Sequence, residues 1–316
     1  MWRSAILLAL VSLLLPVTAF SQSRTPEAAV NLFKNAVKKT GNGDLDGAIE
    51  DYSRAIRLSS HLNGSNFSDK RVGNTVTDYE AEGVRVIDPF TANAFNNRAF
   101  ARFKKGDFAG AIEDCNEALR IRPALETAYL NRAASLRALG DFDGALKDLN
   151  RALEINENFA EAYSNRGSLR LDMGDINGSL VDLNKSIELN DRVAESFYQR
   201  GYAYLALKKF DEGLADLDRA IQLSPEMAWA YQGRGTALMY KGQMLEAIED
   251  FTRAIERNPR LSSAYLNRGL AKLYLGNETD AQQDFTECLR LKPDLKDEVD
   301  SRIRLARHLR RIGTTP

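Results

Sequence analysis

A 34-residue period organises the sequence from Ala92 onward and limits the fold more than any other feature. Six units follow one another without insertion, and the same residue types return at the same positions of each unit. A unit of this length is one supersecondary element, which cannot bury its apolar face alone and must stack on its neighbours. The sequence therefore predicts an array of stacked units. The units begin at Ala92, Glu126, Ala160, Ala194, Ala228 and Ser262.

Each unit has the pattern of two helices that pack face to face. We number the columns of a unit from its first residue: column 4 is aromatic, columns 8, 20 and 27 are mostly small, and column 15 is Gly in five of the six units. Small residues let two helix backbones approach, and the aromatic residue fills the space beside them. Gly ends the first helix, and column 16 then supplies an N-cap for the second helix. The expected caps are Asp107, Asp141, Asp175 and Asn277.

This pattern resembles the tetratricopeptide repeat family over residues 92–293, without a gap. The resemblance implies an all-α fold, a right-handed α-solenoid of stacked helix-turn-helix units with a concave groove. Residues 294–316 are expected to form a capping helix and tail that cover the last unit. The outer side of that helix is basic, which fits either a solvated face, favoured by the helix dipole, or contact with a membrane surface. Its apolar stripe comprises Leu295, Val299, Ile303 and Ala306.

Two segments precede the array. Residues 22–58 are expected to form a divergent first unit, because the stretch from Gly43 to Tyr52 copies the start of a second helix. Residues 59–91 are a polar insertion rich in Gly and Asn, which is either disordered or functional.

The first 21 residues have the form of a secretory signal peptide. Arg3 precedes an apolar run from Ala5 to Val17, and small residues follow before Gln22. The run is shorter than a bilayer span requires. We therefore expect an exported protein, periplasmic or extracellular, with no integral membrane segment after cleavage. An uncleaved membrane anchor is the alternative.

Composition excludes several function classes. Lys plus Arg number 43 and Asp plus Glu number 44, so the net charge of −1 provides no general field for nucleic acid. Two Cys and two His are too few for a zinc cluster or a disulfide scaffold, and Cys115 and Cys288 are expected to be separate buried thiols. The sequence also lacks a nucleophile–base pair and a phosphate-binding Gly loop. It predicts a protein that is not an enzyme, with no catalytic residue, no metal and no cofactor.

Two columns carry the same charge in every unit. Column 7 is always Arg and column 23 is always Asp, and both lie next to core positions. We expect a partly buried ion pair at each repeat joint, which adds geometric specificity. A catalytic pair is needed once, so its recurrence in every unit argues for structure. The pairs are Arg98 with Asp114, Arg132 with Asp148, Arg166 with Asp182, Arg200 with Asp216, Arg234 with Asp250, and Arg268 with Asp284.

In the family that the repeats resemble, several first-helix columns face the groove. Column 6 is an amide in five units, which suits the backbone of an extended peptide; the alternative is that these amides bond to neighbouring helices or water. Gly233 interrupts the series. The last three units add aromatic and apolar groove residues, including Leu266, Leu270 and Leu273, which either bind a partner or pack between first helices. The candidate partner-binding residues are Asn97, Asn131, Asn165, Tyr198, Gln199, Tyr202, Trp229, Tyr240, Asn267 and Tyr274.

These features predict an interaction scaffold that binds a peptide or another protein in a concave groove. The alternative is a structural or assembly factor of the cell envelope that acts through its outer face or its basic C-terminal cap. Some members of the family clamp the C-terminal carboxylate of cytosolic chaperones with Lys and Arg at columns 2, 5 and 6. Columns 2 and 5 carry no Lys here, so this mode is not expected.

Overall fold

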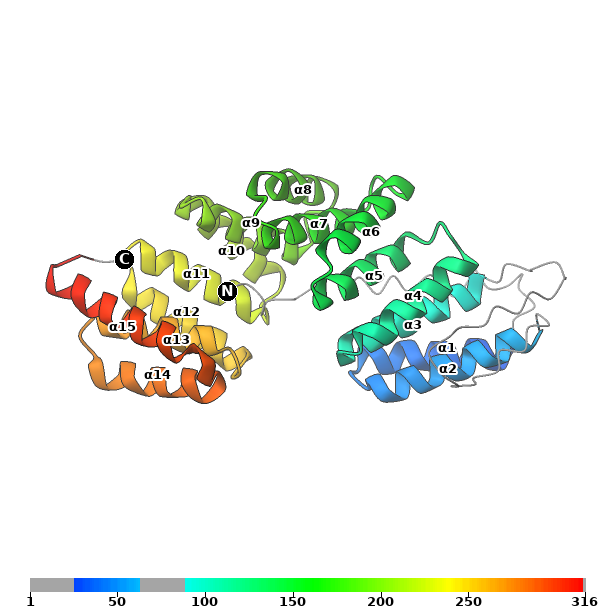
Figure 1. The fold of residues 1–316 in the computed structure, drawn as a ribbon, viewed down its shortest axis with the longest axis horizontal. Helices are drawn as coiled ribbons and strands as arrows, with labels where there is room; N and C mark the ends of the chain where they lie inside the picture. The colour runs from blue at the N-terminus through cyan, green and yellow to red at the C-terminus, as the bar shows by residue number, and fades with distance from the viewer. Residues whose placement is uncertain (1–25, 63–88, 315–316) are drawn as a thin grey trace. The chain divides into compact units, whose positions relative to one another are not determined.

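The computed structural model describes residues 26–62 and 89–314, and within these ranges every regular element is helical (Figure 1). The helices run in antiparallel pairs that stack on one another, which confirms the expected all-α fold of helix-turn-helix repeats. The expected signal peptide and most of the expected insertion lie outside the described residues. None of the described helices combines the length and apolar character needed to cross a membrane.

The helix bounds follow the columns of the sequence. We call α3, α5, α7, α9, α11 and α13 the first helices, and the even-numbered helices from α4 to α14 the second helices. The elements are α1 (Glu27–Gly41), α2 (Leu45–Leu62), α3 (Pro89–Lys105), α4 (Phe108–Ile121), α5 (Glu126–Leu139), α6 (Phe142–Ile155), α7 (Ala160–Asp172), α8 (Ile176–Leu189), α9 (Ala194–Ala206), α10 (Phe210–Leu223), α11 (Ala228–Tyr240), α12 (Met244–Arg257), α13 (Ser262–Tyr274), α14 (Glu278–Leu291), the 3-10 helix η2 (Pro293–Leu295) and α15 (Lys296–Arg311).

The turn inside each hairpin depends on column 15. Gly at this column adopts a left-handed backbone, as at Gly140 with a φ of 87°, and Gly does so without the steric penalty of a Cβ atom. Lys208 occupies the same column in the unit that begins at Ala194, and its φ is 59°. It is the one non-Gly residue with a positive φ in the described part of the chain.

The N-caps of the second helices differ along the chain. Asp107, Asp141 and Asp175 each accept a hydrogen bond from the backbone N–H three residues later, at 2.9–3.0 Å, as expected. Asn277 occupies the expected N-cap position of α14, but its side chain makes no cap hydrogen bond. The residue three positions later explains the difference. It is Gly in the capped helices, where an added Cβ would lie 2.0–2.4 Å from the capping carboxylate, whereas Asp280 stands there in α14.

The chain divides into two compact units at Asn165 and Arg166. In the N-terminal unit, α2 packs directly against α3 although 26 residues separate the two helices in sequence. The hydroxyls of Ser59 and Thr91 are hydrogen-bonded at 2.8 Å across this joint, and the Phe33 ring lies 5.4 Å from that of Phe90. Both helices extend into the segment predicted as a polar insertion, because burial of Phe90 and its neighbours prolongs α3 toward its N-terminus.

In the C-terminal unit, small residues at column 8 bring the two helices of a hairpin together. A Cβ added at Gly235 would lie 2.9 Å from the Phe251 ring, and one at Gly269 would lie 2.6 Å from the Phe285 ring. Bulky side chains of the second helix therefore fill the space left by the first.

α15 packs against α13 and ends the C-terminal unit (red in Figure 1). The expected capping stripe is present: Val299 and Ala306 are buried, and Leu295 and Ile303 pack against the same core cluster. Cys115 and Cys288 are buried and form no disulfide; the first lies in the N-terminal compact unit and the second in the C-terminal one.

Candidate functional site

The charged columns form a repeated hydrogen-bonded pair between the two helices of a hairpin. In each of the six units, Arg Nη2 donates to Asp Oδ1 at 2.6–2.7 Å, and Arg Nε donates to Asp Oδ2 at 2.7–3.0 Å. All six carboxylates are buried. The hydrogen bonds that Arg132 donates to Asp148 raise the pKa of Arg132, and those that Arg200 donates to Asp216 raise the pKa of Arg200. The expected Arg–Asp partners are thus brought together, within a hairpin rather than across a joint.

A third donor of the same Arg crosses to the preceding hairpin. The side chain it reaches is a hydroxyl, an amide or a carboxylate at column 25 of the unit before. The guanidinium therefore ties the two helices of its own hairpin to the second helix of the previous one. The observed Nη1 contacts are Arg98 to Ser53 at 2.8 Å, Arg132 to Asn116 at 2.6 Å, Arg200 to Asn184 at 2.8 Å, Arg234 to Asp218 at 2.6 Å and Arg268 to Thr252 at 3.1 Å.

The amide column is mostly buried between helices. Asn131 donates to Asn96 Oδ1 on the preceding first helix at 2.9 Å, and Asn267 donates to Thr236 Oγ1 at 3.4 Å. Gln199 donates to Glu195 on its own helix at 2.7 Å. The contacts of Asn131 and Asn267 are those of the alternative interpretation, in which the amides bond to neighbouring helices, whereas Gln199 bonds within its own helix.

Other amide atoms have no hydrogen bond. Asn165 Nδ2 and Asn267 Oδ1 are buried and without a partner in the described part of the chain. Asn97 is half-buried beside Tyr52, whose pKa rises to about 12 because the phenol is buried. Two amide atoms of this column, one donor and one acceptor, are therefore left without a hydrogen bond in the described part of the chain.

Tyr198 and Tyr202 lie together on α9. Tyr198 is 3% exposed, and its ring centroid is 5.0 Å from that of the half-buried Tyr202. The Tyr202 ring also contacts α11 at Gly233, where an added Cβ would lie 2.8 Å from Tyr202 Cε2. This contact gives the physical reason for the missing amide at Gly233: a longer side chain and the Tyr202 ring cannot share the same space.

One face of α11 carries the remaining aromatic candidates. Trp229, Gly233, Thr236 and Tyr240 follow at spacings of four, seven and eleven residues, so their side chains share one face of the helix. Trp229 and Thr236 are half-buried, and Tyr240 is 45% exposed. We call Trp229, Thr236 and Tyr240, with the Tyr202 ring over Gly233, the α11 stripe.

The α11 stripe is braced at its C-terminal end. The Tyr240 ring stacks on Phe210 with centroids 5.5 Å apart. The neighbouring Lys241 forms an ion pair with Asp211. These contacts orient Tyr240 while leaving much of its ring exposed.

On α13 the expected groove residues are covered. Leu266, Leu270 and Leu273 are no more than 3% exposed and belong to the core cluster that α15 completes. Tyr274 is half-buried, and burial raises its pKa. Of the aromatic candidates in the C-terminal unit, Tyr198 is thus buried, three are half-buried and Tyr240 on α11 is exposed; the half-buried ones are Tyr202, Trp229 and Tyr274.

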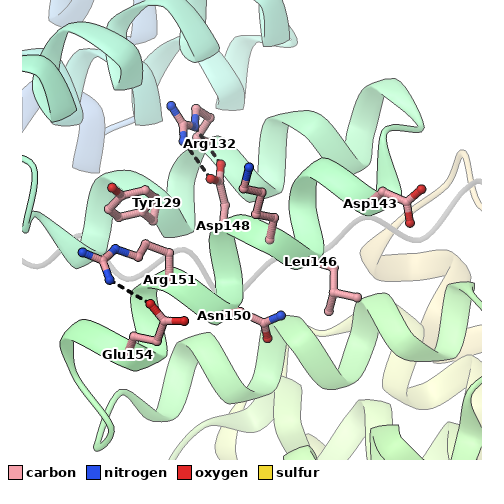
Figure 2. Close-up of a pocket in the computed structure, with 9 residues that line it drawn as sticks. Tyr129, Arg132, Asp143, Leu146, Asp148, Asn150, Arg151 and Glu154 are labelled. Atoms are coloured by element: carbon pink, nitrogen blue, oxygen red, sulfur yellow. Dashed lines mark hydrogen bonds and ion pairs between the residues drawn. The ribbon is translucent and has the colours of Figure 1, made fainter.

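A pocket of about 630 Å³ lies in the N-terminal unit on α5 and α6 (Figure 2). Among its lining residues, Arg132 and Asp148 belong to the charged columns and Tyr129 to the aromatic column 4, and no spacing signal marks the others. Figure 2 shows Arg132 directed at Asp148 and Arg151 directed at Glu154. Four of its nine lining residues form these two ion pairs within the protein. Among the described residues, no group of His, Cys, Asp and Glu side chains is arranged to hold a metal ion.

Family models cover most of the repeat region. A model described as TPR repeat matches residues 133–174. Models described as tetratricopeptide repeat match residues 92–125, 194–227, 228–261, 160–192 and 262–295. No curated protein matches the sequence.

Two solved structures share the fold, and the sequence is also similar to that of a third solved protein. A tetratricopeptide repeat protein from Parabacteroides merdae is 20% identical, with 89% of this chain and 99% of that chain covered at a TM-score of 0.59. PilW, a type IV pilus biogenesis factor, is 21% identical, with 66% and 97% covered at a TM-score of 0.58. MamA is 28% identical, with 52% and 96% covered at a TM-score of 0.45.

Proposed function

The chain belongs to the tetratricopeptide repeat family, and on that premise we propose that it is a non-catalytic scaffold that holds an extended segment of a partner protein along the α11 stripe. The observation that carries this proposal is the partial exposure of aromatic side chains on one face of α11, braced from the neighbouring helices. Aromatic side chains of this kind provide large contact area at low entropic cost and dominate many interfaces.

The length of the α11 stripe fits a short peptide. Trp229 and Tyr240 are eleven residues apart on the helix, a distance of about 16 Å at the rise of an α-helix. An extended chain covers that distance with about five residues. Two aromatic side chains at the ends of such a segment could anchor it, with the Tyr202 ring between them.

Polar atoms near the stripe suit a peptide backbone. Thr236 lies on the α11 stripe, and the Asn267 side chain reaches it from α13. Asn267 Oδ1 has no hydrogen-bond partner in the described part of the chain and is buried, so we propose that the Asn267 side chain turns toward the stripe to accept from a peptide N–H. A bound backbone would also relieve the desolvation of this buried acceptor.

The recurrent Arg–Asp pairs support binding indirectly. Arg200 and Arg234 each join three helices through hydrogen bonds of 2.6–2.8 Å, around the helices that carry the stripe. A surface held in this way loses little conformational freedom when a ligand binds, which favours affinity.

We propose further that the partner is met outside the cytoplasm. The support for this is the leader pattern of residues 1–21, which lies outside the described residues. Cleavage and secretion of the chain can be followed by N-terminal sequencing of the mature protein, and retention of residues 1–21 on a cytoplasmic protein would contradict the proposal.

The α11 stripe can be tested with a library of random peptides displayed on phage and selected on the immobilised full chain. A selected peptide is then titrated against the wild type and against Trp229→Ala and Tyr240→Ala. We expect each substitution to weaken binding about 30-fold, the effect of losing one aromatic hot spot of about 2 kcal/mol.

The matched control is Leu245→Ala on the second helix α12, where the side chain is 66% exposed. It should leave the affinity unchanged. Equal affinity of the Trp229 and Tyr240 variants and the wild type would show that the selected peptides bind elsewhere and would overturn the proposal.

A further inference from the structure

The C-terminal half of α15 presents an exposed stripe that the packing of the cap does not use. Arg304, Leu305, His308, Arg311 and Ile312 are all exposed, and their spacing of one, four, seven and eight residues places them on one side of the helix. Val299 and Ala306 face the other way and are 1% exposed. The helix therefore has one side in the core and a second, cationic and apolar side in solvent. We call these five residues the α15 stripe.

Two large apolar side chains of the α15 stripe are not packed into the hydrophobic core. Leu305 is 56% exposed and Ile312 is 58% exposed, two helical turns apart. Neither belongs to the cluster that joins α15 to α13. Single exposed apolar residues are ordinary, but a pair aligned on one helix face among cations is the arrangement of helices that lie in a membrane interface.

The charges on this end of the chain are of one sign. Five Arg and no acidic residue occur between Ser301 and the C-terminus. Arg307 and Arg310 are bonded to Glu278 on α14, at 3.1 and 3.4 Å. Arg304 and Arg311 have no ion pair with any described residue, so their charge is available to a ligand.

We propose that the α15 stripe docks the protein on the surface of an anionic phospholipid bilayer. Arg304 and Arg311 would contact lipid phosphates, which guanidinium groups bind through paired hydrogen bonds. Leu305 and Ile312 would enter the boundary between headgroups and acyl chains.

The shape of the stripe favours a lipid surface over an acidic peptide. The stripe is the solvent side of a helix, with Leu305 and Ile312 projecting from it, and such a ridge fits a plane. An extended peptide binds in a groove or along a sheet edge instead. This docking is independent of peptide binding at the α11 stripe, because the two involve different residues.

The test follows hydrogen exchange of residues 301–312 in the full chain, mixed with vesicles of phosphatidylglycerol or of phosphatidylcholine. We expect slower exchange with phosphatidylglycerol only, and loss of this protection as salt is raised. Arg304→Gln combined with Arg311→Gln should weaken vesicle binding at this helix about 25-fold, about fivefold for each cation. Leu305→Ser combined with Ile312→Ser should weaken it also. All variants are prepared with the same N-terminus, so a difference between variants reports on α15.

The matched controls are Arg253→Gln and Leu245→Ser on α12, whose side chains are exposed to a similar degree. They should bind as the wild type does. Equal protection by both lipids, or unchanged protection in the α15 variants, would overturn the proposal. Protection by polyglutamate in place of vesicles would also overturn it and would identify an acidic protein as the partner.

Discussion

The Tyr202 ring occupies the space beside Gly233, where a Cβ atom would lie 2.8 Å from Tyr202 Cε2. Leu217 closes the same space, with Cδ2 at 2.9 Å from that position. The first helix of one repeat thus receives an aromatic side chain from the repeat before it. This relationship explains why the series of amides along the first helices stops at one unit and resumes at the next.

Gly233→Ala is therefore expected to destabilise the protein by about 1–3 kcal/mol, although Ala usually favours a helix over Gly. The added methyl group must displace Tyr202 or Leu217. Gly41→Ala is the control, because nothing lies within 4 Å of a Cβ at that position. Thermal melts of the two variants make the comparison, and a Gly233→Ala protein as stable as the Gly41→Ala protein would show that the Tyr202 contact is loose.

Arg200→Ala should cost about 2 kcal/mol or more, because it leaves the buried Asp216 carboxylate without its two hydrogen bonds. The double variant Arg200→Ala with Asp216→Ala should lose less stability than the sum of the two single variants. Denaturant titrations of the three proteins measure the coupling. Additive losses would indicate that the pair does not interact directly.

The exposed pair of Arg290 and Glu287 is the comparison for this cycle. Its shortest hydrogen bond is also 2.6 Å, but both groups lie on the surface of α14. Surface ion pairs of this kind contribute little to the stability of the folded protein. Arg290→Ala should leave the melting temperature unchanged.

Alkaline pH should weaken the fold through Tyr52. Burial raises its pKa from 10.0 to about 12, so the folded state keeps the phenol proton at a pH where the unfolded state releases it. The stabilisation is complete below pH 10 and is lost as the pH rises through 12, a change of about 3 kcal/mol. Unfolding free energies across this range should fall less steeply for Tyr52→Phe than for the wild type. Parallel pH profiles for the two proteins would refute this assignment.

Lys208→Gly should stabilise the protein by about 1 kcal/mol. Lys208 holds the left-handed conformation, with a φ of 59°, that Gly supplies at the same column of the other five units. The reverse exchange, Gly140→Lys, should destabilise by a similar amount. Melting temperatures that move in the same direction for both variants would contradict this account.

Much of the fold could be predicted from the sequence because the same residue types recur at the same packing positions in all six repeats. The small residue at Gly235 predicts a close helix contact, and Phe251 provides it. The ion pairs were predictable for the same reason, since an Arg and an Asp that recur together must meet in every unit. The pairing within a hairpin, with a third bond to the preceding one, was not predictable from spacing alone.

The candidate site was harder to predict, because a column faces both the groove and the next first helix. Asn131 and Leu266 belong to groove columns, yet one is hydrogen-bonded to α3 and the other lies in the core with α15. Sequence periodicity gives the direction of a side chain but not the depth at which the neighbouring helix covers it. On α11, the missing side chain at Gly233 leaves room for the Tyr202 ring, a contact that the column pattern does not reveal.

The joint between α2 and α3 has a consequence for how such a chain can change. The Ser59 and Thr91 hydroxyls meet there at 2.8 Å, so the residues on either side of the connection stack directly on one another. Closing a longer connection costs little, about 0.6 kcal/mol for each doubling of its length. Evolution could therefore lengthen, shorten or replace residues 63–88 while the hairpins on either side kept their register, and an engineer could graft a reporter or a second binding module at this corner.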